Sequence, residues 1–166
     1  MSLATATTLD EATCLAYQFA GIQTCCNKVV GKAYGIADDP GSVIPYTKVT
    51  NDMYWCGRSN SPYYNTLINA AKSGPGDEHL IEYTQAYRYL LDIGYNTACT
   101  PGLGSAIFLH CFGPAKPFTG GCVAIPESHM KYVMQHVDDK TAVVINTYEA
   151  LSGGADWPGS TWPQER

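Results

Sequence analysis

Two short apolar segments flank a polar loop between residues 104 and 125. The first, 105–109, ends at His110, and the second, 123–125, directly follows Cys122. The prolines and glycines between them indicate a turn. We therefore predict two strands that form an antiparallel pair joined by this loop. Such a pair brings His110 and Cys122 near each other, although the sequence leaves the register open.

Helical spacing begins immediately after this stretch. Pro126 and Glu127 suit the first turn of a helix. The apolar residues that follow recur at i, i+3, i+4 and i+7, which predicts an amphipathic helix packed behind Cys122; they are Met130, Val133, Met134 and Val137. A buried strand is predicted for residues 142–145.

The remaining segments have weaker patterns. We predict a helix over 9–19, a short helix over 64–72 that ends at the Ser-Gly-Pro-Gly sequence of 73–76, and a strand over 87–95. Residues 34–63 combine turn signals with aromatic side chains, which either pack the loops onto the core or line a cleft. Residues 152–166 have the character of an irregular tail. No internal repeat is visible.

Composition favours one turn-rich domain. The chain has 166 residues, of which 15% are charged, with 12 tyrosines, 16 glycines and 10 prolines. A chain of this length buries a substantial core. We therefore predict a mainly β fold with a few short helices, of the α+β class. The net charge of −5, without a basic cluster, argues against nucleic acid as a partner.

The seven cysteines are compatible with two environments. An extracellular chain pairs six of them and leaves one thiol free, whereas a cytosolic chain keeps all seven reduced. CxxC spacing is absent, so we expect neither a metal nor another cofactor. The sequence also has no apolar run of about twenty residues that would span a membrane, and its start lacks the features of a signal peptide. If the natural protein is exported, its signal was removed or lies outside this chain.

The histidine and the cysteine suggest nucleophilic chemistry. An imidazole beside a thiol raises the thiolate fraction of a strong nucleophile. Gly120 and Gly121 allow a tight backbone path whose N–H groups form an oxyanion hole, and Thr119 is able to bond the imidazole or the loop. The structural alternative is a core histidine, a plain Gly-Gly turn, and a cysteine that is inert or half of a disulfide.

The pattern H-x(8)-T-G-G-C-V-A resembles the catalytic signature of the L,D-transpeptidase (YkuD) family. Similar segments extend from about residue 33 to 147 and resemble the ErfK/YbiS/YcfS/YnhG-like branch of that family. On this basis we divide the chain into a poorly matched segment 1–32, a catalytic domain 33–148 and an irregular tail 149–166. The matching segments are AYGI (33–36), PY (45–46), NDMYW (51–55), SNSPYYN (59–65), EHLIEY (78–83), YRY (87–89) and GSAIFLH (104–110).

The resemblance implies a catalytic β-sandwich that acts on peptidoglycan stem peptides. Its cysteine attacks the carbonyl of the third residue of a tetrapeptide stem, the terminal D-alanine leaves, and the acyl group passes to the amine of a second stem, giving a 3-3 cross-link. By motif position, Cys122 is similar to the nucleophile, His110 to the base and Thr119 to the orienting residue, with Gly121 and Cys122 giving the oxyanion N–H groups. The family also implies an extracellular or periplasmic location at the cell wall and inhibition by carbapenems.

Two positions depart from the family motif. Gly120 stands where a histidine is usual and Ala124 where an arginine is usual, so another group must hold an anionic donor. We expect His79 to be a second imidazole of the site and Arg88 to be an anion partner. Further candidates for substrate contact are Tyr46, Tyr54, Trp55 and Gly120. His129 and His136 are expected to be solvated.

The N-terminal segment departs further, because too few residues precede residue 31 to supply the family's first strands. We expect a shortened or altered N-terminus, for which six paired cysteines and a free Cys122 is one compatible arrangement. Three alternatives stay open for function: an L,D-carboxypeptidase that passes the same acyl group to water, a cysteine-rich secreted binding module, and an inactive relative that holds peptidoglycan.

Overall fold

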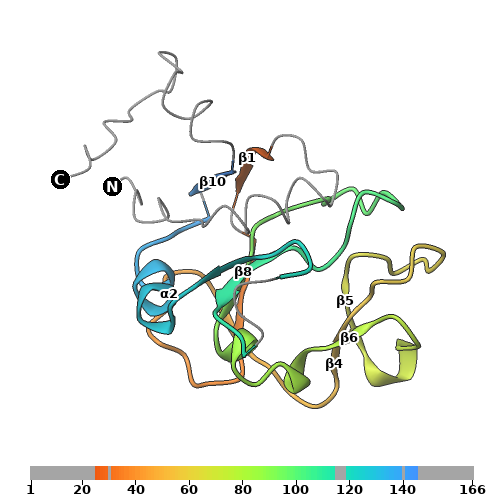
Figure 1. Ribbon diagram of the computed structural model, residues 1–166, viewed down its shortest axis with the longest axis horizontal. Coiled ribbons are helices and arrows are strands. Elements are labelled where there is room, and N and C mark those ends of the chain that lie inside the picture. The colour runs from red at the N-terminus through yellow and green to blue at the C-terminus, as the bar shows by residue number, and fades with distance from the viewer. Residues whose placement is uncertain (1–24, 30, 115–118, 140, 146–166) are drawn as a thin grey trace.

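The protein is mainly β, as the sequence predicts. The computed structural model describes residues 25–29, 31–114, 119–139 and 141–145, and in them three sheets are accompanied by one α-helix and three 3-10 helices (Figure 1). The strands are β1 (Cys25–Val29), β2 (Ala33–Gly35), β3 (Tyr46–Lys48), β4 (Met53–Trp55), β5 (Leu67–Asn69), β6 (Glu78–His79), β7 (Leu90–Asp92), β8 (Phe108–Cys111), β9 (Val123–Ile125) and β10 (Ala142–Ile145). The helices are η2 (Ala70–Lys72), η3 (Leu80–Glu82), η4 (Ala86–Arg88) and α2 (Glu127–Met134).

The five-stranded sheet has the order β3-β2-β7-β8-β9 and is the scaffold of the candidate site. Strands β8 and β9 are adjacent but parallel, with His110 in register with Ala124, so the predicted antiparallel pair is wrong. The turn residues between the two strands indicated where β8 ends, but they did not determine whether β9 runs parallel or antiparallel to it. In the parallel arrangement Cys122, just before β9, comes beside the start of β8.

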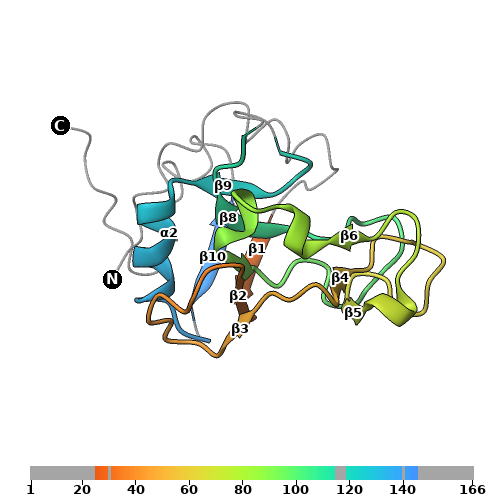
Figure 2. The ribbon, with the colours of Figure 1, turned by 90° about the horizontal axis from the view of Figure 1, so that it is seen from below.

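The two faces of this sheet carry different cores. Alternation along the strands sends Leu91 and Cys111 toward the face covered by α2, and Leu90 and Phe108 toward the other face. Helix α2 forms where the spacing predicts it, and Met130, Val133, Met134 and Val137 are all buried. Figure 2 shows α2 on one side of the sheet and strands β4, β5 and β6 at the opposite end of the molecule.

The three-stranded sheet, of order β5-β4-β6, occupies the segment predicted as loops and a helix. The predicted helix over 64–72 is wrong: Leu67–Asn69 pairs with β4, and only the 3-10 turn Ala70–Lys72 follows. The predicted strand over 87–95 is shorter than expected, because η4 precedes it and β7 covers only Leu90–Asp92. In both segments, pairing with neighbouring strands determined the structure more strongly than local propensity did.

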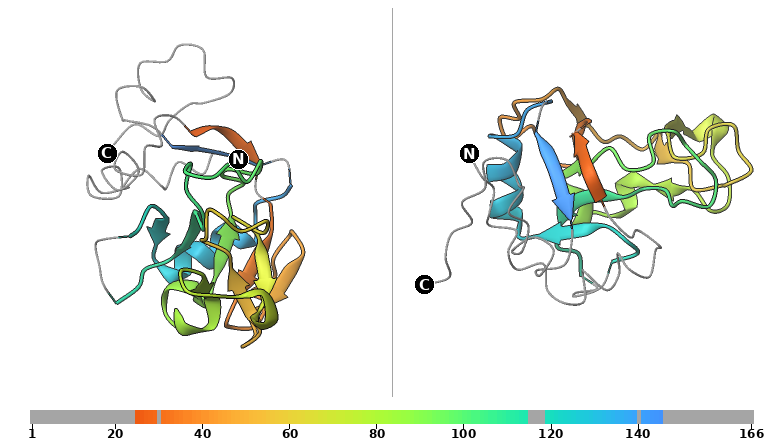
Figure 3. Two further views of the ribbon diagram at one scale, coloured as in Figure 1. Left: turned by 90° about the vertical axis from the view of Figure 1, so that its right-hand side faces the viewer. Right: turned by 90° about the horizontal axis from the view of Figure 1, so that it is seen from above.

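Strands β1 and β10 form an antiparallel ribbon beside α2 (Figure 3). The strand predicted for 142–145 is confirmed. Val143 packs against Ile93, Ile107 and Val123, which lie just after β7, just before β8 and in β9 of the five-stranded sheet. Strand β1 was not predicted. The helix expected over 9–19 and the tail 152–166 lie outside the described residues. Among those that are described, no helix has the length and apolar character needed to cross a membrane.

Candidate functional site

Cys122 lies on the sheet face that points away from α2, and its side chain is 7% exposed. Its thiol donates a hydrogen bond to the carbonyl of Ala106, at 3.1 Å, and the Phe108 N–H approaches the sulfur at 3.4 Å. Ala106 lies just before β8 and Phe108 is its first residue, so the backbone before His110 fixes the position of the sulfur.

The backbone at Ala106 has an uncommon conformation that Asn65 supports. Ala106 has a φ of 58°, which few residues other than glycine and asparagine adopt. Its N–H donates to Asn65 Oδ1 at 3.1 Å, and the same oxygen accepts the indole N–H of Trp55 at 3.0 Å. The amide nitrogen of Asn65 donates to the carbonyls of Tyr95 and Asn96, at 3.1 and 2.9 Å. This one buried amide therefore holds the loop that positions the thiol.

His110 lies on the same face as Cys122 and is oriented by its own backbone. Its Nδ1 is 2.6 Å from the carbonyl oxygen of Cys111, so Nδ1 carries the proton and Nε2 keeps a lone pair while the ring is neutral. The ring meets Tyr87 edge to face, with centroids 5.5 Å apart. Burial lowers the pKa of His110, which favours this neutral form. Its Nε2 is therefore suited to accept a proton.

The thiol is also neutral at rest. Burial, the larger cause, raises the pKa of Cys122 to about 12, with the Glu78 carboxylate adding to this rise and the Phe108 N–H opposing it. The sequence suggested a thiolate favoured by a nearby imidazole, whereas in the structure burial favours the neutral form of both groups. Such a pair suits general-base catalysis, in which the proton leaves the sulfur as the sulfur attacks.

The residues just before Cys122 form a closed turn. The Thr119 hydroxyl donates to the carbonyl of Cys122, at 2.7 Å, and accepts the Gly121 N–H at 3.3 Å. Of the two roles considered for Thr119, the structure shows the bond to the loop backbone. Gly121 has a φ of 133°, which side chains rarely tolerate, whereas a Cβ at Gly120 would meet no atom of the described residues within 4 Å. Among those residues, Gly120 therefore leaves open space two positions before Cys122.

Glu78 and Tyr87 belong to the site, although sequence analysis gave them no role. The Tyr87 hydroxyl donates to Glu78 Oε2 at 2.7 Å. Burial raises the pKa of Glu78. Burial is also the largest cause that raises the pKa of Tyr87, and the charges of Cys122 and Glu78 raise it further. Their signal in the sequence was their place in EHLIEY (78–83) and YRY (87–89), two of the segments that resemble the family.

His79 and Tyr54 are close to each other, on β6 and β4. Their rings stack with centroids 4.1 Å apart and an interplanar angle of 3°. His79 Nε2 is 2.8 Å from the carbonyl of Asn51, and Nδ1 is 3.1 Å from Glu82 Oε1. The Asn51 carbonyl, and then Glu82, raise the pKa of His79. Both ring nitrogens are thus engaged within the protein.

Trp55 is a structural member of the site. It is 6% exposed, donates to Asn65, and packs edge to face on Phe108 with centroids 4.8 Å apart. The structure therefore places Trp55 in the same apolar cluster as Cys122, where it supports the core. Its contact with substrate stays a prediction.

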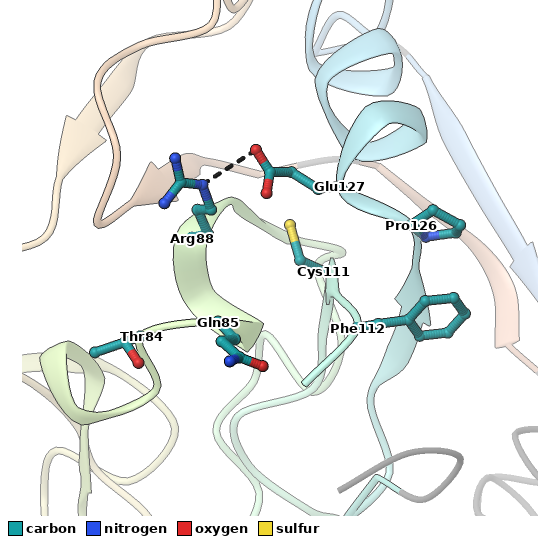
Figure 4. Close-up of a pocket in the computed structure, with 7 residues that line it drawn as sticks. All are labelled: Thr84, Gln85, Arg88, Cys111, Phe112, Pro126 and Glu127. Carbon is teal, nitrogen blue, oxygen red and sulfur yellow. Dashed lines mark ion pairs between the residues drawn. The ribbon is translucent and has the colours of Figure 1, made fainter. Parts of the chain in front are cut away.

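Arg88 and Tyr46 lie on the opposite face of the sheet from Cys122. Figure 4 shows the Cys111 thiol pointing toward the ion pair of Arg88 and Glu127, which is 3.1 Å long. This pocket, of about 380 Å³, is lined by Thr84, Gln85, Arg88, Cys111, Phe112, Pro126 and Glu127. Tyr46 packs on the same core and donates to the carbonyl of Ala37 at 2.7 Å. The structure does not bring these two candidates to Cys122.

Four cysteines have described side chains, and all four are free thiols: Cys56, Cys99, Cys111 and Cys122. The arrangement with six paired cysteines is therefore not the one in this structure. Of these four, Cys122 shares a sheet face with His110. His129 and His136 are exposed, as predicted.

A thiol and an imidazole on one face of a mainly β domain form the kind of site that cysteine-dependent acyl transfer requires. The family model of the L,D-transpeptidase catalytic domain (YkuD) matches residues 28–145, and the chain belongs to this family. This is generally a family of enzymes that act on peptidoglycan. Searches of curated proteins and of solved structures found no match.

Proposed function

We propose that the protein is an L,D-transpeptidase that forms 3-3 cross-links in peptidoglycan through an acyl group on Cys122. The observation that carries this proposal is the tautomer of His110: the Cys111 carbonyl binds Nδ1–H and leaves Nε2 as a base on the face that holds the thiol. Family membership supplies the substrate class, and this geometry supplies the nucleophile and its base. We place the reaction outside the cytoplasm, at the cell wall.

In the first step the thiol turns from the Ala106 carbonyl toward His110. Nε2 accepts the thiol proton while the sulfur attacks the carbonyl carbon of the third stem residue. The bond between that carbon and the nitrogen of the terminal D-alanine then breaks, and His110 returns the proton to the leaving amine. A thioester on Cys122 remains.

In the second step the amine of another stem attacks the thioester. Its proton passes to Nε2, the carbon–sulfur bond breaks, and the proton returns to the sulfur. The oxyanion of each tetrahedral intermediate replaces the Thr119 hydroxyl as the acceptor of the Gly121 N–H, a bond that is long at rest. The open space at Gly120 gives the substrate carbonyl room to approach.

Incubation with a tetrapeptide stem, followed by mass spectrometry, tests this function. We expect loss of D-alanine, a thioester adduct on the protein, and cross-linked dimers. Release of D-alanine without dimers would make the protein an L,D-carboxypeptidase. If the stem binds without any release, the protein is a binding module. Cys99→Ala, at a partly exposed free thiol, is the matched control for Cys122→Ala.

A further inference from the structure

The Cys122 face holds a carboxylate that has no cationic partner among the described residues. Glu78 is partly buried, and its Oε2 accepts the Tyr87 hydroxyl. Within the described chain, Oε1 accepts no hydrogen bond and the side chain forms no ion pair. Carboxylates taken out of water are usually paired with a cation. Oε1 is not buried from solvent, so it is accessible to a donor, such as an ammonium group, that comes from outside the chain.

Three contacts connect this carboxylate to the reacting groups. Tyr87 bonds Glu78 through its hydroxyl and meets the His110 ring at its edge, and its ring packs in the same apolar cluster as Cys122. The charge of Glu78 acts on the Cys122 thiol, and it is the charged side chain with a resolved effect there. A ligand that occupies Oε1 would thus lie beside the nucleophile.

Among the described residues, the rest of the site gives no counter-charge for an anion. Ala124, the register partner of His110, is uncharged, and the described cation Arg88 lies on the opposite face in an ion pair with Glu127. His110 is held neutral by burial. An anionic substrate group would meet only Glu78, which repels it, whereas a cationic group would be attracted.

We propose that Glu78 is a specificity-determining residue that binds a primary ammonium group of a stem peptide. This inference rests on the proposed function. The ammonium donates one hydrogen bond to Oε1 and, by pairing with the carboxylate, removes the negative charge that disfavours loss of the thiol proton. Two stem groups have this chemistry: an amine on the third residue of the donor and the amine of the acceptor.

Two tetrapeptide stems that differ only at the third residue, lysine in one and norleucine in the other, test the donor group. Calorimetry on Cys122→Ala measures their binding without reaction. We expect the lysine stem to bind about tenfold or more tightly, as a hydrogen bond to a charged group allows. Glu78→Gln, added to Cys122→Ala, should abolish this preference, whereas Tyr87→Phe, which keeps the carboxylate, should retain it.

The acceptor group is tested with the norleucine stem as donor and a lysine stem without its D-alanine as acceptor. If Glu78 binds the acceptor, Glu78→Gln lowers the ratio of dimer to hydrolysed product about tenfold, a ratio that does not depend on how fast D-alanine is released. The proposal is overturned if Glu78→Gln changes neither the preference for the lysine stem in calorimetry nor the ratio of dimer to hydrolysed product. The calorimetric experiment requires no reaction, so it still tests the role of Glu78 if the protein releases no D-alanine. Failure of the proposed function is therefore distinguishable from failure of this inference.

Discussion

Cys111 ends β8, Cys122 directly precedes the neighbouring strand β9, and the two side chains face opposite sides of one sheet. Both are buried, at 2% and 7% exposure, and each thiol donates to a backbone carbonyl, that of Tyr89 for Cys111 and that of Ala106 for Cys122. Burial raises the pKa of Cys111 to about 11 and that of Cys122 to about 12. By burial and acidity the two thiols are nearly equivalent.

The two thiols differ in the residues that surround them. Cys111 lies among the apolar side chains beneath α2 and beside the pocket of Figure 4, where Glu127 pairs with Arg88 and Lys131. Cys122 lies in the cluster that contains Tyr87 and shares its face with His110. The comparison teaches that the pKa of a resting thiol does not identify a nucleophile, and neither does a nearby pocket. An available base on the same face is the distinguishing feature.

The largest expected effect comes from removing each thiol in turn. A carbapenem, which mimics the acyl donor, should add covalently to the unmodified protein and to Cys111→Ala but not to Cys122→Ala, because Cys122 is the one of the two that has a base on its face. Intact-protein mass spectrometry reads the adduct. Equal adducts on both variants would move the nucleophile away from Cys122 and remove the distinction between the two faces.

Removal of the base should have the next largest effect. His110→Ala should slow acylation by about 10² or more, because Nε2 no longer takes the thiol proton. His129→Ala, at an exposed histidine on α2, is the matched control and should react at the original rate. Rapid-mixing measurement of the adduct gives both rates. Similar rates in the two variants would leave His110 without a catalytic role.

The same histidine sets a pH dependence. Its pKa lies below the ordinary value of 6.5, so acylation should stay near its plateau at pH 6.5 and fall only as the pH drops through the lowered pKa. Stability changes in the same direction: the folded state binds the proton less well than the unfolded state, so stability is present above 6.5 and is lost as the pH falls. Acylation that already falls above pH 6.5 would contradict this assignment.

The smallest expected effect concerns Arg88, which the sequence suggested as an anion partner. Arg88→Gln should change the acylation rate by less than about twofold and the free energy of unfolding by at most about 0.5 kcal/mol, because an exposed ion pair contributes little. Steady-state acylation and thermal unfolding measure the two quantities. A large loss of acylation would connect the pocket of Cys111 to the chemistry at Cys122.

The sequence predicted the parts of the fold that have strong local patterns. The spacing of Met130, Val133 and Met134 predicted α2 correctly, and the apolar runs located β8, β9 and β10. Relative strand direction was inaccessible, because turn residues are compatible with a parallel as well as an antiparallel return. The segment 64–72 was mistaken for a helix because pairing of Leu67–Asn69 with β4, a contact distant in sequence, determines its conformation.

The sequence proposed His110 and Cys122 as the centre of the candidate site, and the structure places both on one face of the sheet, but the sequence did not indicate what surrounds them. His110 and Cys122 stand in a recognisable motif, whereas Glu78 enters the site through the pairing of β6 with β4. Arg88 was assigned by charge alone, and in the structure it ends the 3-10 helix η4 and lies beside Cys111 and Glu127, on the other face of the sheet. Residue type therefore indicated what the site does, and topology decided which side chains reach it.

Asn65 connects the three-stranded sheet to the surroundings of the Cys122 thiol. Its amide joins Trp55 of β4, the backbone of Ala106 and the turn at Asn96. The acceptor of the Cys122 thiol therefore takes its place only when these segments have docked together. The surroundings of the Cys122 thiol thus depend on contacts between segments 31 and 41 residues apart, and a chain that misplaces β4 would carry an intact motif without this arrangement.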